Sequence, residues 1–475
     1  MNPESKMKKL AEYIGKTEKN TPARDRLSTL FDDQTFVELN TFAGFGEETS
    51  GVITGYGYIG EDLVYAYSQD MTACDGAVTK VNANKIKKVY ELASKTGCPI
   101  VALFDSNGAK LEEANEMLNA YGEILALSNN ISGVVPQIAV VLGTCAGTSA
   151  LMACGADFVV MAQKAELFLN APSVVDDKNQ DAGTAKFAAE TGVVSIVAED
   201  DDIALEQVRK LISVLPQNNL APAPLFESSE NTNANSLIAK AVADIDHMCA
   251  KSVIEAVADV DSVIEINASY ATGVVTALAL VSGATVGFVA NNETTGEFGA
   301  NACDKAARFV RTCDAFNIPV VTLVNTKGFK VTSCPKLIRE GSKLAHAYAE
   351  ATTPKISVIC GQAIGAAYIA MASSQNHDVT LAWPTAAISA MGLEATVEFT
   401  SHDRLKGATN LETARAELVE EYIDTTAGAF KAAENGFVNA VIDPVDTRCA
   451  LIHAIEMLAG KRESRLPKKH SNSVI

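Results

Sequence analysis

Apolar residues occur along this chain in short continuous runs, and segments with helical periodicity separate the runs. A helical pattern over Val81–Lys95 leads through Pro99 into an apolar run, and a glycine turn and a second helical pattern follow. The same order returns after a helical pattern over Lys305–Phe316. Runs that do not alternate between apolar and polar positions are typical of strands covered on both faces. The pattern therefore predicts an α/β protein built from β-α units.

Two long stretches, Ile124–Ala156 and Ile266–Asn292, contain no charged residue. Their length is that of a membrane span, but Gly, Ser and Thr interrupt both of them every few residues, and the first also contains Pro136. We therefore expect buried strands, turns and helices of a globular core rather than membrane helices.

The chain contains an internal repeat. Cys98–Leu111 (CPIVALFDSNGAKL) matches Ile318–Val331 (IPVVTLVNTKGFKV) at a shift of 220 positions. Pro136–Gly147 (PQIAVVLGTCAG) matches Pro354–Gly365 (PKISVICGQAIG) at a shift of 218. Further segments agree at a shift of 222 upstream and of 244 downstream. Four matching segments in one order predict two tandem copies of a single unit.

The downstream shift of 244 exceeds 218 by 26 residues, which predicts an insertion in the second copy between Gly392 and Asn435. Pro, Asn and Ser dominate the segment 216–236, as expected of a linker. The sequence thus predicts an N-terminal half over 1–215, a linker over 216–236 and a C-terminal half over 237–475.

Charge and composition exclude several classes of protein. The net charge of −19 argues against a general nucleic-acid-binding protein, which needs a broad basic face. The first nine residues are polar and basic and do not form a secretory signal. The 10 cysteines show no C-x-x-C pair, and the 6 histidines form no cluster and no H-E-x-x-H motif. We expect a cytoplasmic protein with reduced thiols and no metal site.

In each copy, one predicted strand ends in Gly-x-x-x-Gly and runs into a helical pattern, at Gly143–Gly147 and at Gly361–Gly365. The first N–H groups of a helix lack intrahelical acceptors and lie at the positive end of its dipole, so they suit an anion, including one that exists only during a reaction. Tight strand-to-helix packing also selects glycine. The recurrence of the turn, each time with a second glycine turn at Gly108 or Gly328, favours the functional interpretation.

The first turn also fits the G-x-nucleophile-x-G elbow of hydrolases, with Cys145 as the nucleophile. The second copy has Ala363 at the matching position, so the copies share the turn and not the thiol. We therefore expect Cys145 to be a small buried residue. Basic residues near the turns, within Lys80–Lys88 and Lys327–Lys343, are either solvated or placed to meet a phosphate-bearing ligand.

Segments spread over nearly the whole chain match the motifs of one family, namely Thr21–Leu39, Leu63–Thr72, Ile131–Gly147, Ala307–Val324, Ala349–Ile359 and Leu381–Gly392. By these motifs the chain resembles the carboxyltransferase subunits of biotin-dependent acyl-CoA carboxylases and the related α subunits of sodium-pumping acyl-CoA decarboxylases of the methylmalonyl-CoA type. The resemblance implies two tandem crotonase-like (ClpP/crotonase) β-β-α units. It also implies carboxyl transfer between carboxybiotin and a short-chain acyl-CoA, in either direction.

The resemblance implies two backbone oxyanion holes. Gly147 and Thr148 would stabilise the thioester enolate, and the ureido oxygen of biotin would lie at Gly365, Ala366 and Ala367. The implied substrate-binding residues are Gly108, Ala109, Lys110, Gly328, Phe329, Tyr368 and Ile369.

The resemblance also implies partners. The chain shows no recognisable biotin-attachment lysine and no ATP phosphate loop. The resemblance therefore implies a separate biotin carboxyl carrier protein. It also implies either a biotin carboxylase or a membrane decarboxylase subunit, and the latter would hold this chain at the membrane surface. Because two oxyanion holes must face each other, we expect a homodimer or higher homo-oligomer in which the first copy of one chain meets the second copy of another.

Several positions depart from the family's motifs and leave alternatives open. The usual Gly-Gly-Ala-Arg turn is Asn107–Lys110 here, Thr148 replaces a glycine, and Ile369 is apolar where some members have an acid. One alternative is a crotonase-type hydratase, isomerase or thioesterase, which needs a side-chain acid or base above the oxyanion hole. The other is a non-catalytic scaffold in a carboxylase complex.

Overall fold

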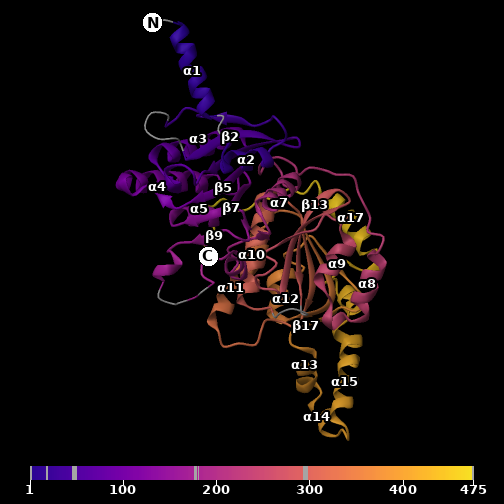
Figure 1. The fold of residues 1–475 in the computed structure, drawn as a ribbon. Helices are drawn as coiled ribbons and strands as arrows, with labels where there is room; N and C mark the ends of the chain where they lie inside the picture. The colour runs from indigo at the N-terminus through magenta and orange to yellow at the C-terminus, as the bar shows by residue number, and fades with distance from the viewer. Residues whose placement is uncertain are drawn as a thin grey trace. The chain divides into compact units, whose positions relative to one another are not determined.

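The structure is a computed structural model that describes residues 3–17, 20–44, 51–175, 179, 181–292 and 298–472. The chain divides into two compact units, Met1–Pro224 (unit 1) and Leu225–Ile475 (unit 2) (Figure 1). The division falls within the segment 216–236, which is rich in Pro, Asn and Ser.

The described part of unit 1 contains a mixed sheet in the order β1-β2-β3-β5-β7-β8-β10, with β9 paired to β7. The pairs β1–β2 and β2–β3 are antiparallel, and the others are parallel. A separate parallel pair joins β4 to β6. The strands are β1 (Val37–Leu39), β2 (Val52–Ile59), β3 (Asp62–Gln69), β4 (Ala77–Val78), β5 (Ile100–Ser106), β6 (Gly108–Ala109), β7 (Gln137–Ala146), β8 (Phe158–Ala162), β9 (Glu166–Phe168) and β10 (Ile196–Ala198).

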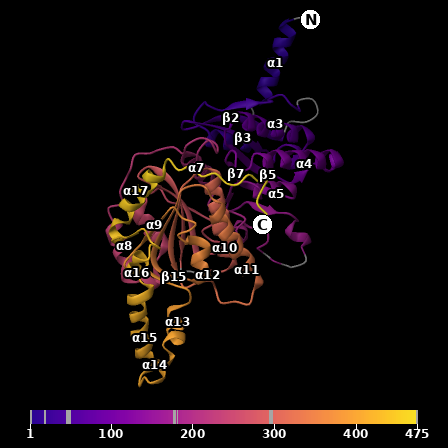
Figure 2. The same cartoon turned by 180° about the vertical axis from the view of Figure 1, so that it is seen from behind.

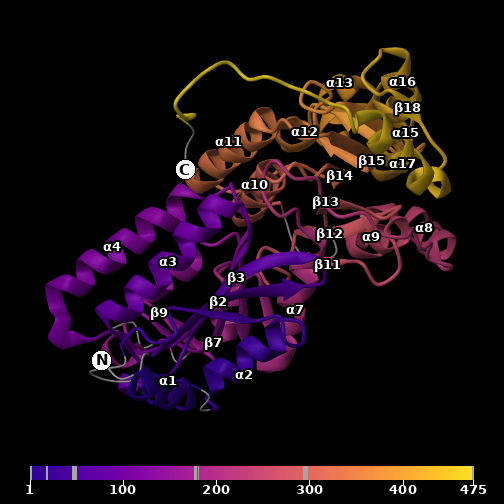
Figure 3. The same ribbon diagram turned by 90° about the horizontal axis from the view of Figure 1, so that it is seen from above.

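Helices cover both faces of this sheet, with α3, α4 and α5 on one face and α2 and α7 on the other (Figure 3). The helices are α1 (Pro3–Thr17), α2 (Pro22–Leu30), α3 (Lys80–Thr96), α4 (Ala114–Asn130), α5 (Thr148–Cys154), α6 (Ala185–Glu190) and α7 (Asp201–Val214). Local sequence sets the ends of α3, because the Thr79 hydroxyl accepts the Asn82 N–H and Gly97 adopts a left-handed conformation at the C-terminus.

Unit 2 repeats the sheet in the order β11-β12-β13-β14-β15-β16-β18, with β17 paired to β15, over the residues that the structure describes. Again the first two pairs are antiparallel and the rest are parallel. The strands are β11 (Ile264–Ile266), β12 (Val274–Val281), β13 (Ala284–Asn291), β14 (Val320–Thr326), β15 (Lys355–Ile364), β16 (Val379–Ala382), β17 (Ala387–Ser389) and β18 (Ala440–Val441).

In unit 2, α10, α11 and α12 lie on one face of the sheet and α8, α9 and α17 on the other (Figure 2). The helices are α8 (Ala234–Ala243), α9 (Ala250–Val257), α10 (Ala300–Ala315), α11 (Pro335–Glu350), α12 (Gly365–Ala372), α13 (Leu393–Thr400), α14 (His402–Lys406), α15 (Leu411–Tyr422), α16 (Ala429–Glu434) and α17 (Thr447–Leu458). A π-helical turn, Ile423–Ala427, follows α15.

The predicted repeat is confirmed element by element. β5 and β14 begin and end 220 residues apart, β7 and β15 lie 218 apart, and β2 and β12 lie 222 apart. The two charge-free stretches form strands and parts of helices, as predicted. The predicted helices correspond to α3 and α10, although α10 starts at Ala300, earlier than its apolar pattern shows.

The predicted insertion in the second copy forms α13, α14 and α15. These helices extend away from the unit 2 sheet (Figures 1 and 2) and pack around a small core of their own, made of Val397, Leu405 and Leu418. In unit 1, a 3-10 helix over Pro172–Val174 follows the corresponding short strand β9, and the next α-helix among the described residues is α6.

Candidate active site

The two predicted glycine turns have nearly the same backbone conformation in both units. Gly147 and Gly365, at the start of α5 and α12, have φ of +61° and +59°. Gly108 and Gly328, in the second turn of each unit, have φ of +105° and +106°. L-residues rarely adopt such angles, so glycine is strongly favoured at all four positions.

In each unit the two turns lie next to each other. A Cβ atom placed on Gly108 would lie 3.9 Å from the Ala146 carbonyl oxygen, and one on Gly328 would lie 3.8 Å from the Ile364 carbonyl oxygen. The structure therefore brings each pair of turns together, at the end of β7 in unit 1 and at the end of β15 in unit 2.

The N–H groups at the start of α5 differ in availability. The Gly147 N–H donates to the Phe168 carbonyl oxygen at 3.0 Å, and the Ala150 N–H donates to the Gly147 carbonyl oxygen at 3.0 Å. Thr148 and Ser149 lie between them, in the part of the first turn where a helix supplies no acceptor of its own. Of the two residues predicted for the first hole, Gly147 therefore already has an acceptor for its N–H group within the chain.

The start of α12 borders an apolar cavity of about 430 Å³. Three predicted residues, Phe329, Ala366 and Ile369, line it together with residues of α11. Ala367 is buried, and burial raises the pKa of Tyr368. The cavity has the size and apolar character to hold a small uncharged ring system beside the first turn of α12.

The first glycine of each Gly-x-x-x-Gly motif has a packing role. A Cβ on Gly143 would lie only 2.0 Å from Asp105 Oδ1, and one on Gly361 would lie 2.4 Å from Asn325 Oδ1. Only glycine leaves room for these side chains. The motif therefore combines one glycine that admits a neighbouring side chain with a second one that turns the chain into a helix.

Cys145 is fully buried, as predicted, and burial raises the pKa of its thiol. Its strand position pairs with Ser106, just as Ala363 pairs with Thr326 in unit 2. A buried thiol that resists ionisation is a poor nucleophile. The structure thus supports a packing role for Cys145.

Most basic residues near the turns already have protein partners. Lys80, Lys87 and Lys88 form ion pairs with glutamates, and Lys327, Arg339 and Lys343 also pair with carboxylates. Lys85 and Lys305 are buried, and their Nζ atoms donate to the carbonyl oxygens of Val52 and Val274 at 2.5 and 2.7 Å. Burial lowers the pKa of both lysines to about 8. These two side chains are structural and not phosphate ligands.

The remaining sequence candidates do not gather into a site. His377 is buried, and burial lowers its pKa to about 3, while His346 and His453 lie on α11 and α17. The described residues contain no group of three or more His, Cys, Asp or Glu that could hold a metal ion. Within the same residues, no helix combines the length and the apolar character needed to cross a bilayer.

A family model described as the carboxyl transferase domain matches residues 16–473. The chain belongs to the carboxyl transferase family. Methylmalonyl-CoA decarboxylase subunit alpha from Veillonella parvula is 39% identical over 477 residues, which cover 95% of this chain and 92% of the relative. Propionyl-CoA carboxylase beta chain from Saccharopolyspora erythraea is 38% identical over 491 residues, covering 95% and 90%.

A solved structure of transcarboxylase 12S, with methylmalonyl-coenzyme A and methylmalonic acid bound, matches with a TM-score of 0.90 and 35% identity. The match covers 100% of this chain and 98% of that one. The predicted fold of two tandem crotonase-like units is confirmed, as is membership in a family of biotin-dependent acyl-CoA carboxyltransferases.

Several polar residues at equivalent positions of the two units were not predicted as site residues from the sequence. Under the same shifts that define the repeat, Gln69 corresponds to Asn291, Asp105 to Asn325, Ser106 to Thr326 and Lys85 to Lys305. A signal was present, because each pair is polar at a position inside or beside an apolar segment. The repeat was predicted from apolar, proline and glycine matches together with the match of Lys110 and Lys330.

Proposed function

We propose that this protein transfers a carboxyl group between carboxybiotin, held on a separate carrier protein, and a short-chain acyl-CoA. The observation that carries the proposal is the pair of adjacent glycine turns that recurs in both units with φ angles that agree within 2° (61° and 59°, 105° and 106°). Carboxyl transfer has two reactants, and negative charge develops on an oxygen of each. A chain with two equivalent anion-stabilising turns suits such a reaction.

The backbone supplies the chemistry. The Thr148 N–H at the start of α5 would donate to the thioester oxygen of the acyl-CoA and stabilise the enolate that forms when the α-proton leaves. The N–H groups of Ala366 and Ala367 would hold the ureido oxygen of biotin, whose ring the apolar cavity fits. Biotin supplies the carboxyl group and a nitrogen that can accept the α-proton, so no side-chain nucleophile or metal ion is required.

A second copy of the chain would complete each site. Apolar side chains around the turns are at least half exposed at matched positions of the two units, namely Leu111, Leu118 and Leu151 in unit 1 and Val331, Ile338 and Ile369 in unit 2. In a two-fold dimer, unit 1 of one chain would cover unit 2 of the other, and the reverse contact would follow by symmetry. Both apolar faces would then be buried and each pair of turns would face its counterpart.

The relatives span both directions of the reaction. A decarboxylase subunit and a carboxylase chain are 39% and 38% identical to this protein. We therefore propose the transfer itself as the function, with a biotin carboxyl carrier protein as the first partner. A biotin carboxylase as a further partner would make the chain part of a synthetic enzyme, whereas a membrane decarboxylase subunit would place it at a membrane surface.

The direct test is biotin-dependent decarboxylation. The purified protein is incubated with methylmalonyl-CoA or malonyl-CoA and free biotin, and the decarboxylated thioester is quantified by mass spectrometry. We expect turnover that requires biotin, whereas the same mixture without biotin should show only the background rate. The absence of turnover with short acyl-CoA thioesters, even with the native carrier protein, would contradict the proposed function.

A further inference from the structure

β7 and β15 carry the same irregularity just before the turns. In unit 1, Phe104 pairs with Val141 and Ser106 with Cys145, so that Asp105 alone faces Leu142–Thr144. In unit 2, Asn325 alone faces Cys360–Gln362. Such a bulge bends a strand and re-aims the residues that follow it. Here the residues that follow lead directly into Gly147 and Gly365.

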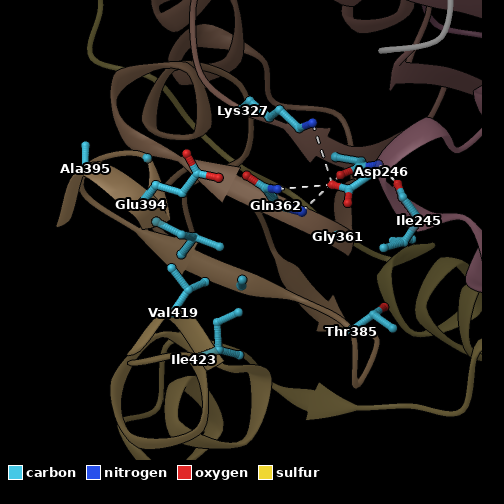
Figure 4. A pocket seen from close by; sticks show the side chains of 14 residues that line it. Ile245, Asp246, Lys327, Gly361, Gln362, Thr385, Glu394, Ala395, Val419 and Ile423 are labelled. Carbon is cyan, nitrogen blue, oxygen red and sulfur yellow. Dashed lines mark hydrogen bonds and ion pairs between the residues drawn. The ribbon is translucent and has the colours of Figure 1, made fainter. Parts of the chain in front are cut away.

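In each unit, one side chain accepts a hydrogen bond from a backbone N–H group of the bulge. Asp105 Oδ1 accepts the Thr144 N–H at 3.3 Å in unit 1. Asn325 Oδ1 accepts the Gln362 N–H at 3.0 Å in unit 2. The missing side chains of Gly143 and Gly361 make this approach possible. Figure 4 shows Gly361 and Gln362 in unit 2, beside a pocket of about 700 Å³.

The neighbouring strand holds the same residue from the other side. The Asp105 N–H donates to Gln69 Oε1 at 3.0 Å, and the Asn325 N–H donates to Asn291 Oδ1 at 3.3 Å. Three strands are therefore connected through one residue in each unit, β3, β5 and β7 through Asp105 and β13, β14 and β15 through Asn325.

The residue that follows Asp105 or Asn325 in the sequence binds the second turn. The Ser106 hydroxyl accepts the Gly108 N–H at 3.1 Å, and the Thr326 hydroxyl accepts the Gly328 N–H at 3.2 Å. Displacement of Asp105 would thus disturb both turns of unit 1 at once, because Thr144 precedes Gly147 and Ser106 precedes Gly108.

We propose that Asp105 and Asn325 are positioning residues for the reaction, Asp105 for the turns that meet the acyl-CoA and Asn325 for those that meet biotin. This inference rests on the proposed function, but the hydrogen bonds that Asp105 and Asn325 themselves make go to residues that are not assigned to the reactants. Misplacement of a reacting group by about 1 Å can cost ~100-fold in rate. We therefore expect Asp105→Ala and Asn325→Ala to lower kcat by about 10- to 100-fold while KM changes only a few-fold.

The conservative exchange separates positioning from general stabilisation. Asp105→Asn keeps an acceptor for the Thr144 N–H and reproduces the residue of unit 2, but its amide nitrogen would face Arg26, whose Nη1 donates to Oδ2 of the aspartate. We therefore expect it to retain more activity than Asp105→Ala. The matched control is Asp201→Ala. Asp201 binds the same Arg26 as Asp105 does, at 2.9 Å from Nε, and the structure shows no hydrogen bond from its side chain to β7 among the described residues. This control should keep kcat near the wild-type value.

A double-mutant cycle tests the geometry without any activity. Gly143→Ala should lower the midpoint of thermal unfolding, because the new Cβ would lie 2.0 Å from Asp105 Oδ1. Addition of Asp105→Ala should then recover part of the loss, since the clash disappears. An inactive wild type together with an intact cycle would refute the proposed function and not the geometry. An active wild type in which Asp105→Asn is as impaired as Asp105→Ala, or in which the alanine variants keep kcat, would overturn the positioning role.

Discussion

The two units share one backbone design but stabilise it with different charges. In unit 1 the residue opposite the bulge is Asp105, whose Oδ2 accepts from Arg26 Nη1 at 2.7 Å, while Arg26 Nε binds Asp201 at 2.9 Å. In unit 2 the residue opposite the bulge is Asn325, and its Nδ2 donates to the Ile245 carbonyl oxygen at 2.5 Å. A carboxylate needs a cation for compensation, whereas an amide can satisfy itself with a backbone carbonyl.

In unit 2, the carbonyl group and the side chain of Ile245 lie against Asn325 and Gly361. The pocket of Figure 4 lies there, lined by Ile245, Asn325 and Gly361 among others. Arg26 Nη2 also donates to the Leu142 carbonyl oxygen at 3.4 Å, and the matching Cys360 carbonyl oxygen accepts instead from the Thr385 hydroxyl at 2.6 Å. The comparison shows that both units keep the same hydrogen bonds from the bulge to the residue opposite it. The other groups that contact this residue and the bulge differ in identity and charge.

The largest effect on activity is expected from a single substitution in the turn before α5 or in the turn before α12. Gly147→Val and Gly365→Val should each lower activity at least about 100-fold, because oxyanion donors contribute that much and valine is strained at positive φ. A Cβ on Gly147 would meet no atom of the described residues within 4 Å, so the valine would occupy the ligand's space. A Cβ on Gly365 would lie 3.1 Å from the Ala390 carbonyl oxygen. Rates with methylmalonyl-CoA and biotin provide the measurement.

Co-expression of the two variants tests whether the units cooperate between chains. A mixed two-fold dimer would have one site with both turns damaged and one with both intact. Random pairing should therefore restore about a quarter of the wild-type activity, since half of the dimers are mixed and each has one good site of two. Mixed dimers that form, as shown with two affinity tags, but remain inactive would rule out a site shared between chains.

A smaller effect, on the pH dependence of stability, is expected from the two buried lysines, which lie at matched positions of the units. Lys85 and Lys305 have a pKa of about 8 in the folded protein, against 10.5 as the ordinary value. Between these values the unfolded chain binds more protons, so each lysine makes the stability rise with pH, by about 1 kcal/mol per pH unit at most. Below pH 8 both states are protonated and the contribution is constant.

Lys85→Met and Lys305→Met remove this contribution. The midpoint of thermal unfolding of the wild type should therefore rise relative to both variants as the pH increases from 8 towards 10. The range ends there because buried tyrosines, such as Tyr90 with a pKa raised to about 12, add the opposite trend. Lys88→Met, at a partly exposed ion-pair residue of the same helix, serves as the matched control. A difference that stays constant with pH would refute the assignment.

The smallest effect is expected from Cys145→Ala, which makes unit 1 resemble unit 2 at this position. The variant should keep activity within about 2-fold and lose roughly 1 kcal/mol of stability, because only one buried sulfur atom is removed. Steady-state rates and thermal unfolding measure the two quantities. A rate loss of several orders of magnitude would restore the nucleophile hypothesis.

The sequence by itself determined the repeat, the β-α architecture and the positions of the turns. These features depend on local physics. Apolar runs that do not alternate with polar residues must be covered on both faces, and the positive φ angles at Gly108, Gly147, Gly328 and Gly365 strongly favour a residue without a Cβ. The insertion in the second copy was also legible, because it changes the spacing between matched segments. The family followed from motifs spread over nearly the whole chain, of which Ile131–Gly147 contains one of the turns.

Only the tertiary structure decided which donors, acceptors and charges meet. Gly143 and Gly361 read as part of an anion-binding motif, but they serve the approach of Asp105 and Asn325 from a neighbouring strand. The Gly147 N–H is occupied by Phe168, 21 positions further along the chain (168 − 147), and Lys85 read as a surface cation but lies buried against Val52. These outcomes depend on strand register and on the bulge, which bring distant residues together, and no local pattern encodes such pairings.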